Sequence, residues 1–285
     1  MSLYVVATPI GNLEDMTPRA VRILSEVDLI AAEDTRHSRA LLTHFGISKP
    51  LFSCHKFNEA KRAEQFLQAL RDGKSIALIS DAGTPCISDP GHILVRLAAD
   101  EGFNVTPVCG VNAVIAALSV SGFDADTFSY IGFLPRSKKD ILKKLEPYLA
   151  SDAPFVFYES PLRIVQTLTC IDDASPQALV CLCNDLTKRF EKIYRGTVQD
   201  VLDDLANNPN HEKGEYTCVV QTKPLAEAKD IMPAISPEAQ LVDLIIKNDC
   251  DLKTAATLLK EQNKNLRKNE IYQAMLNVKD LFDAD

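Results

Sequence analysis

The sequence predicts an α/β protein with two α/β domains and a small helical C-terminal region. Three observations lead to this prediction. Apolar strand patterns alternate with helical patterns over residues 1–121, the alternation then starts again, and three helical patterns follow a stretch rich in proline. A chain of 285 residues is also long for a single hydrophobic core. We expect an N-terminal α/β domain over 1–121, a second α/β domain with a mixed sheet over 122–222, a linker over 223–236 and a helical C-terminal domain over 237–285.

The first domain is expected to be a mostly parallel sheet with helices on both faces. Its strands are short, continuous apolar runs such as Leu29–Ala32, which is typical of strands buried on both sides. Thr17 and Pro18 suit the N-cap and first position of a helix. The expected strands are Leu3–Thr8, Leu29–Ala32, Leu51–Cys54, Ser75–Ile79 and Asn104–Val108, and the expected helices are Pro18–Glu26, Ser38–Phe45, Asn58–Asp72, Ile93–Ala99 and Ala113–Ser121.

The second domain repeats the alternation of strand and helix patterns, with one interruption. Two strands follow one another near its middle without an intervening helix, so we expect a mixed sheet. The expected strands are Phe128–Phe133, Phe155–Tyr158, Leu179–Cys183, Ile193–Arg195 and Tyr216–Gln221, and the expected helices are Lys138–Leu149, one ending near Cys170, and Val198–Leu205.

The C-terminal region begins after a stretch that contains Pro224, Pro233 and Pro237. Its three helical patterns have short polar connections, which is typical of a helix-turn-helix bundle. A helical cap that packs on the second domain or on a partner fits the same pattern, and both readings stay open. The three patterns are Glu238–Lys247, Leu252–Gln262 and Leu266–Val278.

Charge and composition limit the classes of function. The net charge of −8 argues against non-specific binding of nucleic acid by the whole surface, although local basic clusters occur. The chain lacks a basic leader and an apolar run of about 20 residues, so we expect a cytoplasmic protein with no membrane partner. The eight cysteines include no Cys-x-x-Cys pair. Cys181 and Cys183 share one face of a strand, where we expect core packing rather than a metal site.

Polar loops collect where the strands of the first domain end, the edge of an open α/β sheet that binds ligands. The loop Ser80–Gly91 holds two glycines and two prolines and has an unusual backbone path. Asp81 follows its strand directly, so its carboxylate either points into the crevice or bonds its own turn. Asp89 and Pro90 are expected to be the N-cap and first residue of the next helix.

Several of these segments together resemble a known family. The resemblance is carried by Ala7–Leu13, Ala31–Arg36, His55 with Asn58 and Glu59, Ser80–Gly91, Ile115–Gly122, Gly132–Arg136, Phe157–Pro161 with Arg163, Leu186–Lys188 and Arg195–Thr197. In this order they are similar to the ribosomal RNA small-subunit methyltransferase I family of the tetrapyrrole-methylase-like superfamily. The match runs through nearly the whole chain, and the run Ser80–Gly91 is far more specific than a lone glycine fingerprint.

The resemblance implies an S-adenosylmethionine-dependent methyltransferase that acts on a cytidine 2′-hydroxyl of small-subunit ribosomal RNA. The two α/β domains would form a cleft that holds S-adenosylmethionine in a folded pose, and members are typically homodimers. The partner would be ribosomal RNA or the assembled small subunit. The implied cofactor contacts are Pro9, Ile10, Asp81, Ile87, Asn112, Ala113, Tyr158 and Leu186.

Methyl transfer is an in-line displacement, so the enzyme must hold the acceptor oxygen close to the methyl carbon on one axis. A ribose hydroxyl is a poor nucleophile at neutral pH, and a base that takes its proton helps. Glu33 and Asp34 follow a strand and His55 follows another, so these three are the candidate catalytic residues. Structural ion pairs would explain the same side chains. The candidate RNA-binding residues are Arg36, Arg136, Lys138 and Lys188.

Other functions remain as alternatives. The same fold and cofactor would also serve a tetrapyrrole or a protein side chain as acceptor, although a tetrapyrrole site needs arginines in the cleft. A nucleotide-dependent oxidoreductase is disfavoured because the first strand is followed by Gly11 alone and not by Gly-x-Gly-x-x-Gly. A non-catalytic RNA-binding protein built around the helical tail is the last alternative.

Overall fold

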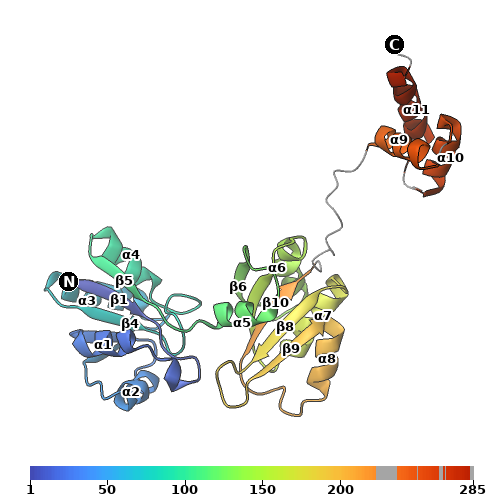
Figure 1. Ribbon diagram of the computed structural model, residues 1–285. Coiled ribbons are helices and arrows are strands. Elements are labelled where there is room, and N and C mark those ends of the chain that lie inside the picture. The colour runs from blue at the N-terminus through green and yellow to red at the C-terminus, as the bar shows by residue number, and fades with distance from the viewer. Residues whose placement is uncertain (223–235, 249, 263–265, 267, 283–285) are drawn as a thin grey trace. The chain divides into compact units, whose positions relative to one another are not determined.

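The structure is a computed structural model, and it describes residues 1–222, 236–248, 250–262, 266 and 268–282. The chain divides into two compact units, Met1–Pro224 and Leu225–Asp285. Among the described residues, the first unit contains two five-stranded sheets and the second contains three helices (Figure 1). The α/β fold class expected from the sequence is therefore confirmed.

The first sheet is entirely parallel, with the strand order β3-β2-β4-β1-β5. All residues of β2 and β4 are buried because helices cover both faces of the sheet. This burial explains why the strands are uninterrupted apolar runs. Their bounds are β1 Ser2–Val6, β2 Leu29–Ala32, β3 Leu51–Ser53, β4 Ile76–Ile79 and β5 Asn104–Val108.

Two helical layers cover this sheet. Residues of α1 (Pro18–Glu26) and α2 (Thr35–His44) pack on one face, and residues of α3 (Glu59–Arg71) and α4 (His92–Asp100) pack on the other. A short 3₁₀ helix, η1 (Leu13–Asp15), precedes α1. The helices thus complete two apolar layers and leave the loops at the strand ends to form the site.

The second sheet is mixed, as predicted, with the order β6-β7-β10-β8-β9. Only β6 and β7 run parallel, and the other neighbouring pairs are antiparallel. Helices α6, α7 and α8 pack on one face. The bounds are β6 Ser129–Phe133, α6 Lys138–Leu149, β7 Phe155–Glu159, α7 Ile164–Ala174, β8 Leu179–Asn184, β9 Lys192–Thr197, α8 Val198–Ala206 and β10 Tyr216–Gln221.

Helix α5 (Ala113–Ser121) follows the first sheet in the chain but packs against the second. Its Ala117 and Leu118 lie in one apolar cluster with Cys181 and Cys183. The two sulfur atoms are 3.9 Å apart and buried, so these cysteines are core residues, as expected. The sequence prediction assigns this helix to the N-terminal domain, whereas its packing joins it to the second sheet.

The C-terminal unit has its own apolar core. Its helices are α9 Pro237–Asn248, α10 Leu252–Gln262 and α11 Lys268–Phe282, which confirms the three expected helices. The core includes Leu241, Leu259 and Ile271, so each helix contributes a buried side chain. Most of the expected linker, residues 223–235, lies outside the described residues. No helix among the described residues is long and apolar enough to span a membrane.

Candidate functional site

Three loops of the first sheet are joined by hydrogen bonds where their strands end. Thr8, after β1, exchanges two backbone hydrogen bonds of 2.9 Å with Gly83, which follows β4. The Thr8 hydroxyl also donates to the Ser80 carbonyl at 3.2 Å. Thr84 donates to the carbonyl of Val111, after β5, at 3.4 Å. The loops therefore form one continuous edge, as the carboxyl ends of parallel strands predict.

The loop from β4 to α4 has a strained path. Cys86 and Ser88 have φ angles of 70° and 66°, which side chains other than glycine seldom adopt. Gly91 has φ 126°, and a Cβ atom there would lie 2.5 Å from Leu78 Cδ2. The loop is therefore held close against β4, and a side chain at position 91 is excluded.

The expectation that Asp89 caps α4 is wrong. The N-cap residue of α4 is Gly91, and the amides of Gly91 and Ile93 donate to Glu59 Oε1 at 2.9 and 2.8 Å. Glu59 is the first residue of α3 and its side chain is buried, so a distant carboxylate satisfies the helix terminus. This arrangement leaves the Asp89 carboxylate without a capping role.

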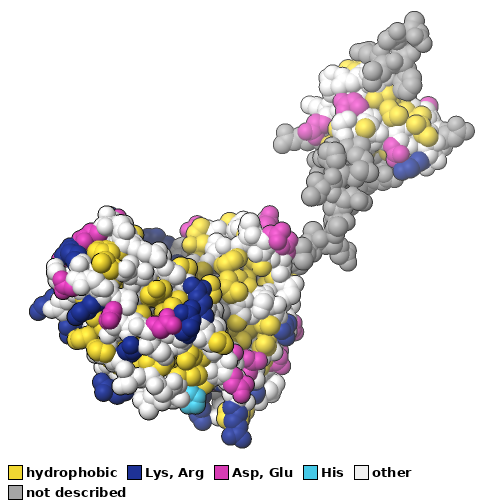
Figure 2. All heavy atoms as spheres, turned by 60° about the vertical axis from the view of Figure 1, so that its left-hand side comes forward, with side chains coloured by type: hydrophobic (Ala, Val, Ile, Leu, Met, Phe, Trp, Pro, Cys, Tyr) yellow, Lys and Arg dark blue, Asp and Glu magenta, His cyan; other side chains and the backbone are white. Residues whose placement is uncertain are grey.

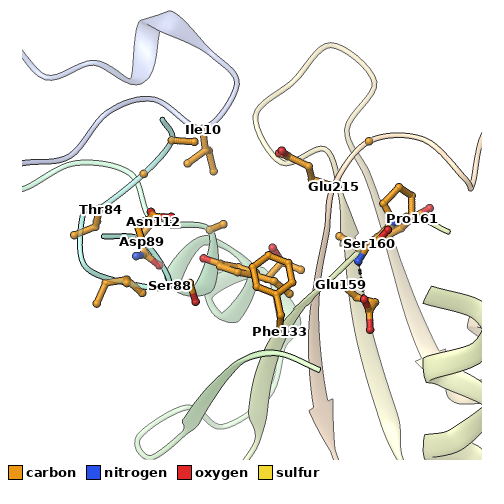
Figure 3. A pocket seen from close by; sticks show the side chains of 18 residues that line it. Ile10, Thr84, Ser88, Asp89, Asn112, Phe133, Glu159, Ser160, Pro161 and Glu215 are labelled. Carbon is orange, nitrogen blue, oxygen red and sulfur yellow. Dashed lines mark hydrogen bonds between the residues drawn. The ribbon is translucent and has the colours of Figure 1, made fainter. Parts of the chain in front are cut away.

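A cavity of about 350 Å³ lies between the loops of the first sheet and the edge of the second (Figure 3). Among the expected cofactor contacts, five line it: Ile10, Ile87, Asn112, Ala113 and Tyr158. The other lining residues are Ala82, Gly83, Thr84, Ser88, Asp89, Phe133, Glu159, Ser160, Pro161, Gly214, Glu215, Tyr216 and Thr217. Its size is in the range of small-molecule sites, and most of its wall is apolar.

The other three expected cofactor contacts, Pro9, Asp81 and Leu186, are not among the residues that line the cavity. Asp81 Oδ1 accepts the Asp34 amide at 3.1 Å and so ties the ends of β4 and β2 together. Pro9 is buried next to Ile10. Leu186 packs with α5 and the second sheet. These residues support the wall instead of forming it.

Residues 214–217 are a part of the wall that sequence reasoning missed. They are the first two residues of β10 and the two residues before it, and the rule that ligands lie at carboxyl ends of strands does not select them. Because β10 is antiparallel to both neighbours, Tyr216 pairs with Glu159 at the end of β7 and with Asn184 at the end of β8. The amino end of β10 is therefore on the same edge as the carboxyl ends of its neighbours.

Aromatic side chains from the second sheet face the first-sheet loop. The Ser88 hydroxyl and the Tyr130 hydroxyl are 2.6 Å apart, and the Tyr130 ring lies 5.2 Å from the Tyr158 ring. Phe133 stands 5.5 Å from Tyr158 and is 58% exposed. Burial raises the pKa of both tyrosines, so they are neutral hydrogen-bonding groups at physiological pH. Phe133 thus gives the cavity an accessible aromatic surface.

A buried ion pair fixes the rim around Ser160 and Pro161. Arg163 Nη2 lies 3.2 Å from Glu159 Oε2 and donates to the carbonyls of Leu134 and Pro135. The Ser160 amide donates to the other Glu159 oxygen at 2.8 Å. Glu159 therefore holds the turn after β7 and also Arg163, which in turn connects to the segment after β6.

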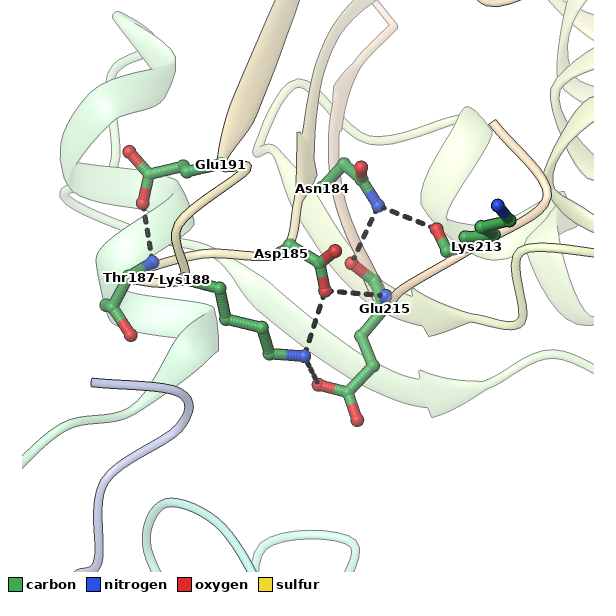
Figure 4. A network of polar contacts seen from close by, with 7 residues as sticks. All are labelled: Asn184, Asp185, Thr187, Lys188, Glu191, Lys213 and Glu215. Atoms are coloured by element: carbon green, nitrogen blue, oxygen red, sulfur yellow. Dashed lines mark hydrogen bonds and ion pairs between the residues drawn. The ribbon is translucent and has the colours of Figure 1, made fainter. Parts of the chain in front are cut away.

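Lys188 connects the loop after β8 with the segment before β10 (Figure 4). Its ammonium lies 2.9 Å from Asp185 Oδ1 and 2.8 Å from Glu215 Oε2. Burial lowers its pKa, but the hydrogen bonds to Glu215 and Asp185 outweigh burial and raise it. A Cβ atom on Gly11 would lie 2.3 Å from Lys188 Cγ, so a side chain at position 11 would clash with the Lys188 side chain where it stands. Lys188 is thus a structural contact between the two halves of the unit.

A group of carboxylates lies at the ends of β2 and β4. Burial and the charge of Asp81 raise the pKa of Glu33. Burial and the charge of Glu33 raise the pKa of Asp89 to about 7. Only Asp89 of these three lines the cavity. Its carboxylate therefore changes charge near neutral pH at a place open to a ligand.

The two other predicted catalytic residues have local structural roles. Asp34 is the N-cap of α2, and its carboxylate accepts from the Arg36 amide and guanidinium at 2.8 Å. These bonds hold the pKa of Asp34 well below its usual range. The Asp34 cap also explains why α2 begins at Thr35, three residues before the expected Ser38. His55 Nε2 lies 3.1 Å from Asn58 Nδ2.

The predicted RNA-binding residues differ in their surroundings. The Arg36 side chain is 90% exposed and pairs with Asp34, and Lys138 pairs with Asp173 at 2.7 Å. Arg136 is exposed and forms no ion pair with any residue that the structure describes. On the face shown in Figure 2, basic and acidic side chains are interspersed on the first unit. Among the described residues, no three His, Cys, Asp or Glu side chains are arranged so that they could hold a metal ion.

Sequence comparisons identify close relatives. A family model described as Tetrapyrrole (Corrin/Porphyrin) Methylases matches residues 2–202. A curated Haemophilus influenzae protein, "Ribosomal RNA small subunit methyltransferase I", is 43% identical over 272 residues, covering 95% of each chain. A protein of the same name from Pseudomonas aeruginosa is 42% identical over 277 residues, covering 96% of each chain.

Structure comparisons agree on the fold. Diphthine synthase matches with a TM-score of 0.61 at 14% identity, covering 78% of this chain and 90% of that one. Cobalt precorrin-4 methyltransferase matches with a TM-score of 0.55 at 19% identity, covering 78% of this chain and 96% of that one. At these identities the similarity shows a shared architecture.

Proposed function

Because the chain belongs to the ribosomal RNA small subunit methyltransferase I family of tetrapyrrole methylases and is a methyltransferase, we propose that it methylates small-subunit ribosomal RNA. The acceptor we propose is a cytidine 2′-hydroxyl, and the donor is S-adenosylmethionine. The observation that carries this proposal is the cavity at the strand ends, whose wall includes five residues expected to contact the donor.

The residues of the cavity fit S-adenosylmethionine. This cofactor supplies an electrophilic methyl group on a positively charged sulfur atom. Apolar lining residues such as Ile10 and Ile87 suit its adenine and carbon chain, and the acidic lining residue Glu215 suits its positive charge. We propose that Ile10, Ile87, Asn112, Ala113 and Tyr158 contact the cofactor while Pro9, Asp81 and Leu186 support them.

The charge of the wall favours RNA over a tetrapyrrole as the acceptor. The described residues that line the cavity include Asp89, Glu159 and Glu215 but neither lysine nor arginine. A tetrapyrrole bearing carboxylates would be repelled here, since recognition of carboxylates requires cationic partners. A nucleoside instead finds an exposed aromatic ring, Phe133, on which a base can stack. The cavity therefore supports an acceptor that brings an uncharged base to the wall.

Basic residues outside the cavity would hold the phosphates of the RNA. Arg136 is the strongest of the four candidates because it is exposed and has no ion pair within the described part of the chain. Arg36, Lys138 and Lys188 already pair with carboxylates, so phosphate binding there competes with those pairs.

The proposal extends to assembly and location. Following the family resemblance, we propose that the protein is a homodimer and works in the cytoplasm, with ribosomal RNA or the small subunit as its partner. Sedimentation equilibrium tests the dimer, because a monomer mass at micromolar concentration would contradict it.

Mass mapping of methylated rRNA fragments tests the function. Small subunits are purified from cells that lack the gene and incubated with the protein and methyl-labelled S-adenosylmethionine. We expect one cytidine to gain one labelled methyl group on its ribose, and naked RNA run in parallel identifies the preferred form. Label on a base, on protein or nowhere in the RNA contradicts the proposal.

A further inference from the structure

Asp89 stands out because its sequence context predicts a role that another residue performs. An Asp-Pro pair before a helix normally provides the N-cap, but Glu59 accepts the amides of Gly91 and Ile93 at 2.9 and 2.8 Å. The strained backbone at Cys86 and Ser88 instead carries Asp89 to the cavity wall, as Figure 3 shows. Conformational strain persists only where the surrounding structure enforces it, which marks this loop as functional.

We propose that Asp89 is the catalytic residue that accepts the proton of the ribose 2′-hydroxyl during methyl transfer. This inference rests on the proposed function. The oxygen–carbon bond forms as the carbon–sulfur bond breaks, and the electron pair of the broken bond stays on sulfur. The hydroxyl proton passes to an Asp89 carboxylate oxygen and later leaves to water, so charge and atoms balance.

Position separates Asp89 from the three bases suggested by the sequence. A general base must lie within hydrogen-bonding reach of the proton it takes, and of these four side chains only Asp89 is part of the cavity wall. The Asp34 carboxylate is occupied by the start of α2 and by Arg36. Glu33 is not among the lining residues, although it is close enough for its charge to act on Asp89.

The groups around Asp89 make it a usable base near neutral pH. Glu33 after β2 and Asp81 after β4 repel its negative charge, while Ser80 donates a hydrogen bond to it. Tyr130 of β6 and Tyr158 of β7 are neutral hydroxyl groups that lie close enough to interact with the Asp89 charge. The charges of Asp89 and of Glu59 in α3 both act on the thiol of Cys86. With a pKa of about 7, Asp89 is ionised often enough to act and basic enough to hold a proton.

The first test is the Asp89→Asn substitution. It keeps the shape of the side chain but cannot accept a proton, and we expect kcat to fall by about 10²–10⁴-fold. Calorimetry should show an affinity for S-adenosylmethionine within about threefold of the wild type. Asp204→Asn on the exposed surface of α8 is the matched control and should leave kcat unchanged.

The second test measures the proton directly and needs neither cofactor nor RNA. Carbon-13 NMR of the aspartate carboxyl groups should show one signal that titrates near neutral pH and disappears in Asp89→Asn. In Glu33→Gln this titration should move to lower pH, because the repelling charge is gone. In a separate assay with cofactor and RNA, the inflection in the pH profile of kcat/KM, which reports the free enzyme, should also move to lower pH in that variant.

Several outcomes overturn the inference. A folded Asp89→Asn enzyme with wild-type kcat shows that another group takes the proton, and loss of cofactor binding shows a donor contact instead. If Asp89→Asn does not fold, the pH profiles of the wild type and Glu33→Gln are compared instead. An inflection at the same pH in both enzymes refutes the role of Asp89 as the base. If the wild type leaves rRNA unmethylated, the proposed function itself has failed, which is a separate result.

Discussion

Glu59 accepts a hydrogen bond from the backbone amide of Gly91, 32 residues further along the chain, at 2.9 Å. The same oxygen accepts from Ile93, so one buried carboxylate satisfies two amides at the start of α4. This contact fixes the end of the loop that carries Asp89. The position of the proposed base therefore depends on a residue from another helix.

Replacing Glu59 tests this dependence. Glu59→Ala leaves two amides without their acceptor and should lower the free energy of unfolding by about 1–3 kcal/mol. Cofactor affinity should fall as well, because the loop that carries Ile87 loses its anchor. Glu59→Gln keeps an oxygen acceptor and should restore most of the stability. Glu64→Ala, an exposed ion-pair residue on the same helix, is the control and should change stability by less than about 1 kcal/mol. Equal unfolding curves for Glu59→Ala and the control would refute the capping role.

The raised pKa of Asp89 also predicts a pH dependence of stability. The folded state holds this proton up to a pKa of about 7, whereas the unfolded chain releases it near pH 4. Stability from this group is therefore present below pH 4 and is lost as the pH rises to 7. Asp89→Asn should melt several degrees above the wild type at pH 8 and together with it at pH 4. A constant difference across that range would contradict the shifted pKa.

Asp34 separates a capping role from a catalytic one. Asparagine caps helices as well as aspartate, so Asp34→Asn should keep the stability and turnover of the wild type. Asp34→Ala removes the cap and should lower the midpoint of urea unfolding. A 100-fold drop in kcat for Asp34→Asn alone would show that Asp34 is the base after all.

Phe133 should bind the RNA and not the cofactor. Removing the ring in Phe133→Ala should raise KM for the small subunit by about tenfold, since base stacking contributes about 1–3 kcal/mol. Calorimetry should show an unchanged affinity for S-adenosylmethionine, and Phe133→Tyr should restore KM because it keeps the ring. Weaker cofactor binding in Phe133→Ala would instead assign the ring to the adenine of the donor.

Substitutions at Arg136 and Lys188 test which basic side chains contact the phosphates of the RNA. Arg136 is exposed and has no ion pair among described residues, whereas Lys188 already contacts Asp185 and Glu215. Arg136→Ala should reduce the slope of log affinity against log salt by about 1. Lys188→Ala should leave that slope unchanged but lower the melting temperature. RNA binding measured by filter retention at several salt concentrations distinguishes the two, and the reverse pattern would contradict both assignments.

Local patterns in the sequence were enough to predict the architecture. Continuous apolar runs identified the buried strands of the first sheet. Two strand patterns with no helical pattern between them indicated the mixed second sheet. Polar residues at strand ends marked the edge that holds the cavity. These predictions hold because strand burial and helix periodicity involve neighbours a few residues apart.

The sequence determined which segments form the site, but only the tertiary structure decided which side chain has which role. Asp89 lies on the cavity wall because Glu59 took the helix cap, and Tyr216 lines the wall because β10 runs antiparallel to its neighbours. Both outcomes depend on partners more than 30 residues away, whereas sequence patterns report contacts within a turn or two. A carboxylate's burial and charged neighbours, which set its pKa, exist only after folding.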